Sequence, residues 1–124
     1  MKEITKAQEE ILKTLWKIKN GAASDVLDAL PNPKPAYNTV STVIKVLEKK
    51  GYVAHNTYGK TNVYYAIISK QEYAQYQLKQ TVKGLFNGSL NQMVSSFVKN
   101  KDVSLNELEE LKALIEQEIK NQKK

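Results

Sequence analysis

The chain has 124 residues, of which 41% are hydrophobic and 26% are charged, a balance typical of a folded protein and not of a disordered one. The absence of cysteine excludes disulfides and thiolate metal sites, and without a signal-peptide core or an apolar run of roughly 18 residues we predict a cytoplasmic protein. The net charge of +6, carried by lysines without a single arginine, suits a polyanionic partner, although solubility alone would also favour basic residues.

The first part of the chain has the outline of a helix-turn-helix. Thr5 and Gln8 form a capping box that predicts a helix over about residues 6–19. A short helix over 25–30 follows, with Ser24 as its predicted cap. The three prolines in 31–35 cannot continue that helix, because each proline restricts the residue before it. A third helix then follows a stiff turn, which is the helix-turn-helix pattern.

Between the first two predicted helices, the pair Ala22-Ala23 is too short to assign from the sequence alone. We regard it as a candidate for one extended pair at the edge of a sheet.

Two stripes at helical spacing run along residues 36–50. One stripe is apolar and predicts a face packed against a core: Val40, Val43, Ile44 and Leu47. The opposite stripe carries an amide, two hydroxyls and two cations: Asn38, Ser41, Thr42, Lys45 and Lys49. Asparagine pairs bidentately with adenine, a threonine methyl packs on the thymine methyl, and lysines suit phosphates. We interpret the segment as a DNA recognition helix, against the alternative that the hydroxyls are ordinary helix-surface groups.

The first turn of this helix adds two further candidates for DNA contact, Tyr37 and Thr39. For Tyr37, contact with a phosphate and packing under the preceding turn are equally open.

A β-hairpin is predicted directly after the recognition helix, which ends at Gly51. Two strand-like runs, 52–57 and 62–68, flank a glycine-containing turn. A hairpin in this place is a wing, and we expect Tyr58 and Lys60 at its tip to contact the DNA backbone or the minor groove.

His55 is the only histidine of the chain. With no cysteine and no clustered carboxylates near it, we predict no metal site, no catalytic site and no cofactor, and therefore no enzyme. The sequence also offers no convergent polar cluster for a small-molecule ligand.

Three amphipathic helices are predicted in the last part of the chain, over about 70–86, 90–100 and 105–120. A segment of this size buries too little surface to be stable alone, so its apolar stripes need a partner. A second copy of the chain is the simplest partner, and packing against the N-terminal domain is the alternative. We predict a winged-helix DNA-binding domain over 1–68 and a helical dimerisation domain over 69–124, with these dimerisation residues: Leu90, Met93, Val94, Phe97, Leu108, Leu111, Leu114 and Ile115.

Three sequence stretches together resemble the BlaI/MecI penicillinase-repressor family: ITKAQEEILKTLW, AYNTVSTVIKVLEKKGYV and YGKTNVYYAIIS. The resemblance covers nearly the whole chain and implies a mainly α fold, with a winged helix-turn-helix, a small antiparallel sheet and a C-terminal helical dimerisation domain. It also implies homodimers that bind inverted-repeat operators, often of TACA/TGTA type, and block transcription. The family's base-contacting positions fall on Asn38, Ser41 and Thr42, and the resistance repressors have basic residues at the first two.

The resemblance further implies a membrane-bound metalloprotease sensor as a partner, which triggers cleavage of the repressor in the helix before the last one. By alignment the bond is Ser96–Phe97, where the resistance repressors have Asn-Phe. The copper-responsive branch of the family uses C-terminal cysteines, which this chain lacks, so metal sensing is not expected.

Our main hypothesis from the sequence is therefore a homodimeric, winged-helix transcriptional repressor that binds double-stranded DNA. The alternative is a winged-helix protein-interaction module that binds no DNA.

Overall fold

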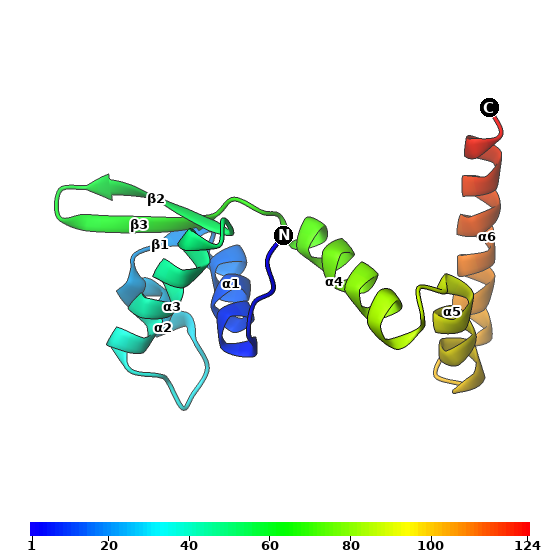
Figure 1. Ribbon diagram of the computed structural model, residues 1–124, viewed down its shortest axis with the longest axis horizontal. Helices are drawn as coiled ribbons and strands as arrows, with labels where there is room; N and C mark the ends of the chain where they lie inside the picture. Colours follow the sequence, from blue (N-terminus) through cyan, green and yellow to red (C-terminus); the bar gives the residue numbers. More distant parts are fainter. The chain divides into compact units, whose positions relative to one another are not determined.

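The computed structural model describes all residues from Met1 to Lys124 (Figure 1). Its elements follow in this order: α1 (Lys6–Ile18), β1 (Asn20–Gly21), α2 (Ala23–Ala29), α3 (Tyr37–Lys49), β2 (Val53–Tyr58), β3 (Thr61–Ala66), α4 (Lys70–Leu85), α5 (Leu90–Lys99) and α6 (Leu105–Gln122). The predicted class, mainly α with a winged helix-turn-helix and a small antiparallel sheet, is confirmed. No helix combines the length and the apolarity that a membrane crossing requires.

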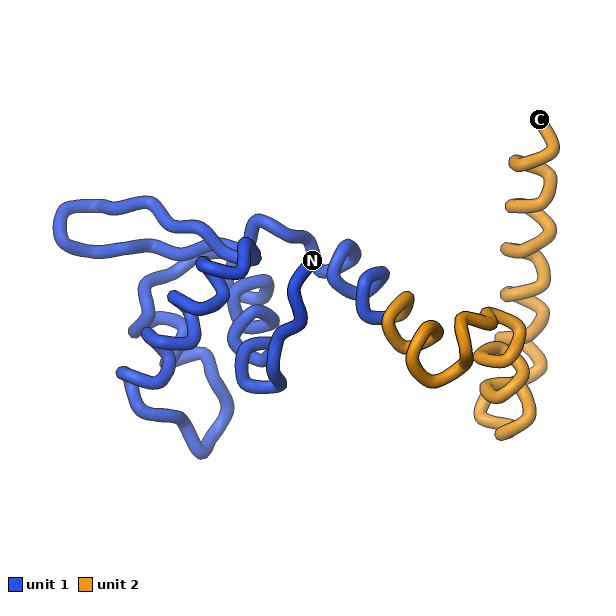
Figure 2. Tube along the Cα trace, in the orientation of Figure 1, with its two compact units in different colours: residues 1–77 blue, residues 78–124 orange.

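The chain forms two compact units, which Figure 2 shows in different colours: unit 1, Met1–Gln77, and unit 2, Leu78–Lys124. Unit 1 therefore includes the first two turns of α4, whereas the sequence predicted a domain boundary just before that helix. The functional division into a DNA-binding and a dimerisation domain stays a prediction.

Unit 1 is built around a single apolar core between α1, α2, α3 and the sheet. The predicted capping box begins α1: the Gln8 backbone N–H donates to Thr5 Oγ1 at 3.2 Å, and the Thr5 N–H donates to Gln8 Oε1 at 3.0 Å. The apolar stripe of α3 points into the core, with Val40, Ile44 and Leu47 fully buried. The packing thus uses the helical spacing that the sequence predicted.

The sheet is antiparallel with strand order β1-β3-β2. Strands β2 and β3 form the predicted hairpin, in register from Val53 opposite Ala66 to Tyr58 opposite Thr61. The turn at its tip is tighter than predicted, since only Gly59 and Lys60 lie outside the strands. Gly59 has φ +63°, a backbone conformation that glycine adopts readily.

Two local expectations at the start of α2 are wrong. The extended pair is Asn20–Gly21, not Ala22-Ala23, and it pairs with Tyr65 and Tyr64 of β3. The helix cap is not Ser24: α2 begins at Ala23, and the Asp25 carboxylate accepts a hydrogen bond from the Ala22 N–H at 2.9 Å.

At Gly21 the backbone passes close to side chains of α1 and α2. A Cβ at this position would stand 2.9 Å from Asp25 Cβ and 3.0 Å from Ile18 Cδ1, so only glycine allows this approach without a shift of its neighbours.

The turn between α2 and α3 is held by Lys34. Its ammonium donates to three backbone carbonyls at the C-terminal end of α2, those of Leu27 at 3.2 Å, Asp28 at 2.7 Å and Leu30 at 2.7 Å. The Leu27 carbonyl also accepts from the Leu30 N–H at 3.2 Å, and a cation is favourable at this end of the helix dipole. Lys34 therefore stabilises the turn that positions α3.

Unit 2 has the predicted helices but no buried residue: every buried side chain of the chain lies in unit 1. Its helix caps are formed, because the Ser89 hydroxyl accepts from the Gln92 N–H and Ser104 forms a capping box with Glu107. The apolar side chains that pack within the unit are only half-buried: Val82, Phe86, Met93, Val103 and Leu108.

Candidate nucleic-acid interface

The polar stripe of α3 points to solvent. Asn38, Thr42, Lys45 and Lys49 are exposed, and Ser41 is half-buried. On the opposite face of the same helix lie fully buried residues of the core, so the orientation of α3 is fixed by packing. The sequence hypothesis required this orientation, since side chains turned inward could not reach a base edge.

A polar cleft of about 330 Å³ lies beside this stripe, between α3, the start of α2 and the hairpin. It brings together four of the predicted DNA-contacting residues, Tyr37, Ser41, Lys45 and Lys60. Its remaining lining residues are Ala22, Ala23, Ser24, Thr61, Asn62 and Tyr64. Two ammonium groups and several hydroxyls around one concave surface suit a phosphate of the DNA backbone.

Neither lysine of this cleft is neutralised by a carboxylate of the chain. The two side-chain ion pairs, Lys13 with Glu9 and His55 with Glu48, involve other residues. Lys45 and Lys60 are both exposed, so their charges are available to a polyanion.

Sequence reasoning missed Ser24, Thr61, Asn62 and Tyr64 as lining residues of the cleft. For Thr61 and Asn62 a signal existed, because they follow the tip residue Lys60 directly along β3. For Ser24 there was none, since its place beside α3 depends on how α2 packs. Tyr64 is buried, with 5% of its surface exposed.

Five predicted contact residues do not line the cleft. Three of them, Asn38, Thr42 and Lys49, belong to the exposed stripe of α3, and the other two line separate recesses. Thr39 lines an apolar groove of about 190 Å³, together with Ile11, Val43 and the prolines of the turn. Tyr58 is 64% exposed and lines a recess with Val63 and Tyr65. Successive strand residues point to opposite faces, so this recess is on the other side of the hairpin from Tyr64.

His55 connects the end of α3 to the base of the hairpin. Its Nδ1 lies 2.5 Å from Glu48 Oε2, and its ring lies 5.3 Å from the ring of Tyr64, measured between centroids. Glu48 belongs to α3 and Tyr64 to the cleft, so this contact helps to position the wing. No group of three or more histidine, cysteine or acidic residues is arranged to hold a metal ion.

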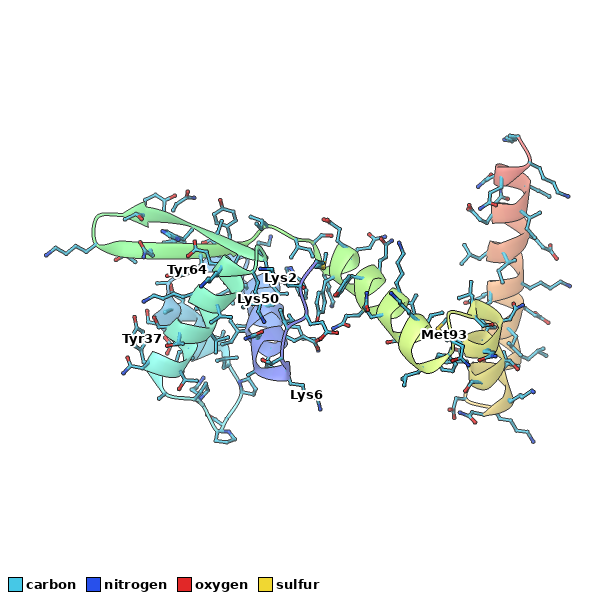
Figure 3. The ribbon with its side chains drawn as sticks, in the orientation of Figure 1. Lys2, Lys6, Tyr37, Lys50, Tyr64 and Met93 are labelled. Atoms are coloured by element: carbon cyan, nitrogen blue, oxygen red, sulfur yellow. The ribbon has the colours of Figure 1, made fainter.

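The lysines at the end of α3 have different surroundings. Lys49 is exposed, whereas the Lys50 ammonium donates at 2.9 Å both to the Glu3 carbonyl and to Gln8 Oε1. Tyr52 donates to the carbonyl of Lys2, so the N-terminal segment is held beside Lys50 (Figure 3). Lys50 thus has a structural role and contributes little to the DNA-facing charge.

The predicted dimerisation residues fall into two groups within unit 2. Met93 and Leu108 are half-buried and pack within the unit. The exposed fraction of the side chain is 63% for Phe97 and 66% for Leu114. The exposed members of the set are Leu90, Val94, Phe97, Leu111, Leu114 and Ile115. The Ser96–Phe97 bond lies inside α5, and both of its residues are exposed.

We compared the chain with protein families, with individual relatives and with solved structures. A family model described as Penicillinase repressor matches residues 4–117. The chain is 31% identical over 123 residues to the penicillinase repressor of Bacillus licheniformis. The alignment covers 98% of this chain and 95% of that protein. The chain is 26% identical over 114 residues to the methicillin resistance regulatory protein MecI of Staphylococcus aureus, covering 91% and 93%. A crystal structure of a mutant MarR from E. coli aligns with a TM-score of 0.48 and 16% identity, covering 94% of this chain and 79% of that chain.

Proposed function

We propose that this chain, which belongs to the penicillinase repressor family, is a sequence-specific repressor that binds an inverted-repeat operator as a homodimer. Membership of that family makes it a DNA-binding transcriptional repressor. The contacting residues, the dimer and the symmetry of the operator are our proposal, as is its place of action in the cytoplasm beside the chromosome.

The observation that carries the DNA-binding proposal is the outward polar stripe of α3. In a helix-turn-helix, such a helix enters the major groove and its side chains contact base edges. Asn38 and Thr42 would read bases, and Ser41 would contact a base or its neighbouring phosphate. Lys45 and Lys60 would hold one backbone phosphate in the cleft, with Tyr37 donating its hydroxyl. Lys49, Thr39 and Tyr58 would contact the backbone on either side.

The dimer proposal rests on the apolar surface of unit 2. A large exposed apolar surface on a soluble protein marks an interaction site. Here it is formed by exposed side chains of α5 and α6, among them Phe97 and Leu114. A second copy would bury these side chains, and the two-fold symmetry of such a dimer would match an operator with two inverted half-sites.

The test of DNA binding begins with selection of bound fragments from random duplexes, followed by affinity measurements. Asn38→Ala and Thr42→Ala should each weaken binding to the selected operator by about 1–3 kcal/mol and relax the preference for one base. The matched control is Asn56→Ala, which changes an exposed asparagine on the hairpin outside the cleft.

Lys60→Ala should weaken binding to all sequences alike and reduce the salt dependence by about one counterion. If the two α3 variants bind the operator as the unaltered chain does, the recognition surface is misplaced. A protein-interaction module then becomes the better function.

We also propose that repression ends when a membrane-bound metalloprotease sensor triggers cleavage at Ser96–Phe97. The support is the family membership together with the exposure of both residues on α5. The cut would divide the apolar surface of unit 2 and so weaken the dimer. Mass spectrometry of the chain from cells that express such a sensor should detect a fragment ending at Ser96. An intact chain after induction would contradict this part of the proposal.

A further inference from the structure

Unit 2 separates its charges along the chain. Residues 78–101, which include the end of α4 and all of α5, carry four lysines and no acidic residue, a net charge of +4. Helix α6 carries five acidic residues and two lysines, a net charge of −3. Both ion pairs of the chain, at Glu9 and at His55, lie in unit 1. The opposite charges of unit 2 therefore form no ion pair with each other within one chain.

A basic recess lies in unit 2, which is orange in Figure 2. The recess has a volume of about 350 Å³ and contains Lys79 and Lys83, both exposed. The two lysines are four positions apart on α4 and therefore share one side of the helix. The other lining residues are Leu78, Val82, Gly88 and Leu90. Leu78 is 49% exposed and Leu90 61%, so the recess presents apolar side chains beside its two cations.

A second recess of the same unit is acidic. It has a volume of about 400 Å³ and contains the exposed carboxylates of Glu107 and Glu110 on α6. The other lining residues are Phe97, Val103, Leu111 and Leu114. Its four residues on α6 follow the spacing of a single helix face. The acidic recess thus matches the basic recess in composition, apolar side chains with two like charges, but its charges have the opposite sign.

This complementarity suits a contact between two copies of the chain. Opposite charges across an interface attract, and like charges suppress the wrong arrangement. In a two-fold dimer each contact occurs twice, because residue i meets residue j and residue j meets residue i. A dimer that joins basic to acidic recesses would contain two equivalent clusters of lysine and glutamate. The exposed apolar side chains of the two recesses would be buried against each other between these charges.

We propose that the basic recess of one chain binds the acidic recess of a second copy, with Lys79 and Lys83 pairing with Glu107 and Glu110 of the partner subunit. The inference rests on the proposed homodimer. It adds which surfaces of unit 2 meet, and it names the charges by which unit 2 selects a second copy over other apolar partners.

The test uses charge reversal and mixed chains. In the variant Lys79→Glu with Lys83→Glu both clusters contain only carboxylates, and in the variant Glu107→Lys with Glu110→Lys both contain only ammonium groups. Each variant alone should have a dissociation constant of the homodimer raised roughly tenfold or more at low salt, because like charges then face each other. An equimolar mixture should form a heterodimer about as tight as the unaltered homodimer, since every carboxylate again faces an ammonium group. Sedimentation measures the affinities, and native mass spectrometry identifies the mixed dimer.

Two control variants reverse the same number of charges outside the recesses. Lys120→Glu with Lys124→Glu matches the first variant, and Glu109→Lys with Glu116→Lys matches the second. All four of these residues are exposed and line neither recess. Both controls should dimerise within about threefold of the unaltered chain. The defect of the recess variants should shrink at about 1 M salt, where the Debye length is about 3 Å.

The outcomes distinguish this inference from the proposed function. A monomeric unaltered chain contradicts the proposed homodimer, and the inference falls with it. If the unaltered chain dimerises and the recess variants dimerise equally tightly, the inference alone is overturned, as it is if the controls weaken the dimer as much. A mixture that does not restore the dimer also overturns it, because the four residues then act within one chain or on a different protein.

Discussion

The two units of the chain have similar helix caps but very different interiors. Unit 1 buries 14 apolar side chains, contributed by four helices and the hairpin with the residues that flank it. Unit 2 buries none, although its helix α5 carries as regular an apolar stripe as α3 does. The stripes of unit 1 meet each other within one chain, and much of the apolar surface of unit 2 stays uncovered.

This difference predicts that the stability of the two units depends on protein concentration in different ways. A core of this kind gives unit 1 the apolar burial on which folding depends. Unit 2 lacks that contribution, and capping alone contributes only about 1 kcal/mol per helix end. We therefore expect the stability of unit 1 to be independent of protein concentration, and that of unit 2 to depend on it because a second chain completes its core.

The largest effect should come from removing core volume in unit 1. Ile44→Ala deletes part of a fully buried side chain in α3 and should lower the free energy of unfolding by about 2–5 kcal/mol. Urea denaturation measures this, and the loss should be the same at low and high protein concentration. The matched change in unit 2 is Ile115→Ala, whose side chain is 55% exposed. The loss of unfolding free energy caused by Ile115→Ala should vary with protein concentration. If the losses of both variants depended on protein concentration in the same way, the proposed difference between the units would be contradicted.

A charge placed on the exposed face of α6 should dissociate the dimer. Leu114→Asp puts a carboxylate where we expect contact with the second chain, and burying it unpaired should weaken dimerisation by roughly 100-fold, or about 3 kcal/mol. Sedimentation should then report a monomer, and affinity for the two-half-site operator should fall. The control is Ile67→Asp, at a 54% exposed apolar residue of unit 1. A dimer that survives Leu114→Asp would place the interface elsewhere.

Much of this architecture was predictable because it follows from local signals. The capping box of Thr5, the proline-rich turn and the two stripes of α3 each act within a few residues. They predicted the helices, and the position of Gly59 predicted the hairpin. The family was also recognisable from three continuous stretches, and the matching family model confirms it.

What the sequence did not predict depends on contacts between distant residues. The strand at Asn20–Gly21 exists because β3 pairs with it, more than 40 positions later. The N-cap of α2 is Ala22 and not the predicted Ser24, and the Asp25 side chain accepts from the Ala22 N–H. Tyr73 lies in the helix predicted over 70–86, but its hydrogen bond to Glu9 of α1 joins residues 64 positions apart. The predicted contact residues on α3 stay predictions until DNA binding is measured.

Alkaline pH should weaken the contact between Tyr73 of α4 and Glu9 of α1. The folded pKa of Tyr73, about 12, is above its ordinary value of 10, so the native state keeps this proton longer than the unfolded chain does. The contribution is fully present below pH 10 and is lost as the pH rises through about 12, by about 2–3 kcal/mol in total. Tyr73→Phe has no proton to lose at this position and should show a smaller decline in denaturation experiments. An equal decline in both chains would mean that other groups account for it.

The smallest expected effects are those of two chemically matched capping boxes, one in each unit. The Gln8 N–H donates to Thr5 Oγ1 at 3.2 Å, and the Glu107 N–H donates to Ser104 Oγ at the same distance. Thr5→Ala and Ser104→Ala should each cost about 1 kcal/mol. Because the local chemistry is alike, a difference between them reports on their surroundings. The Thr5→Ala loss, followed by thermal melting, should be constant with dilution. The Ser104→Ala loss should change, since in the proposed dimer the second chain stabilises α6.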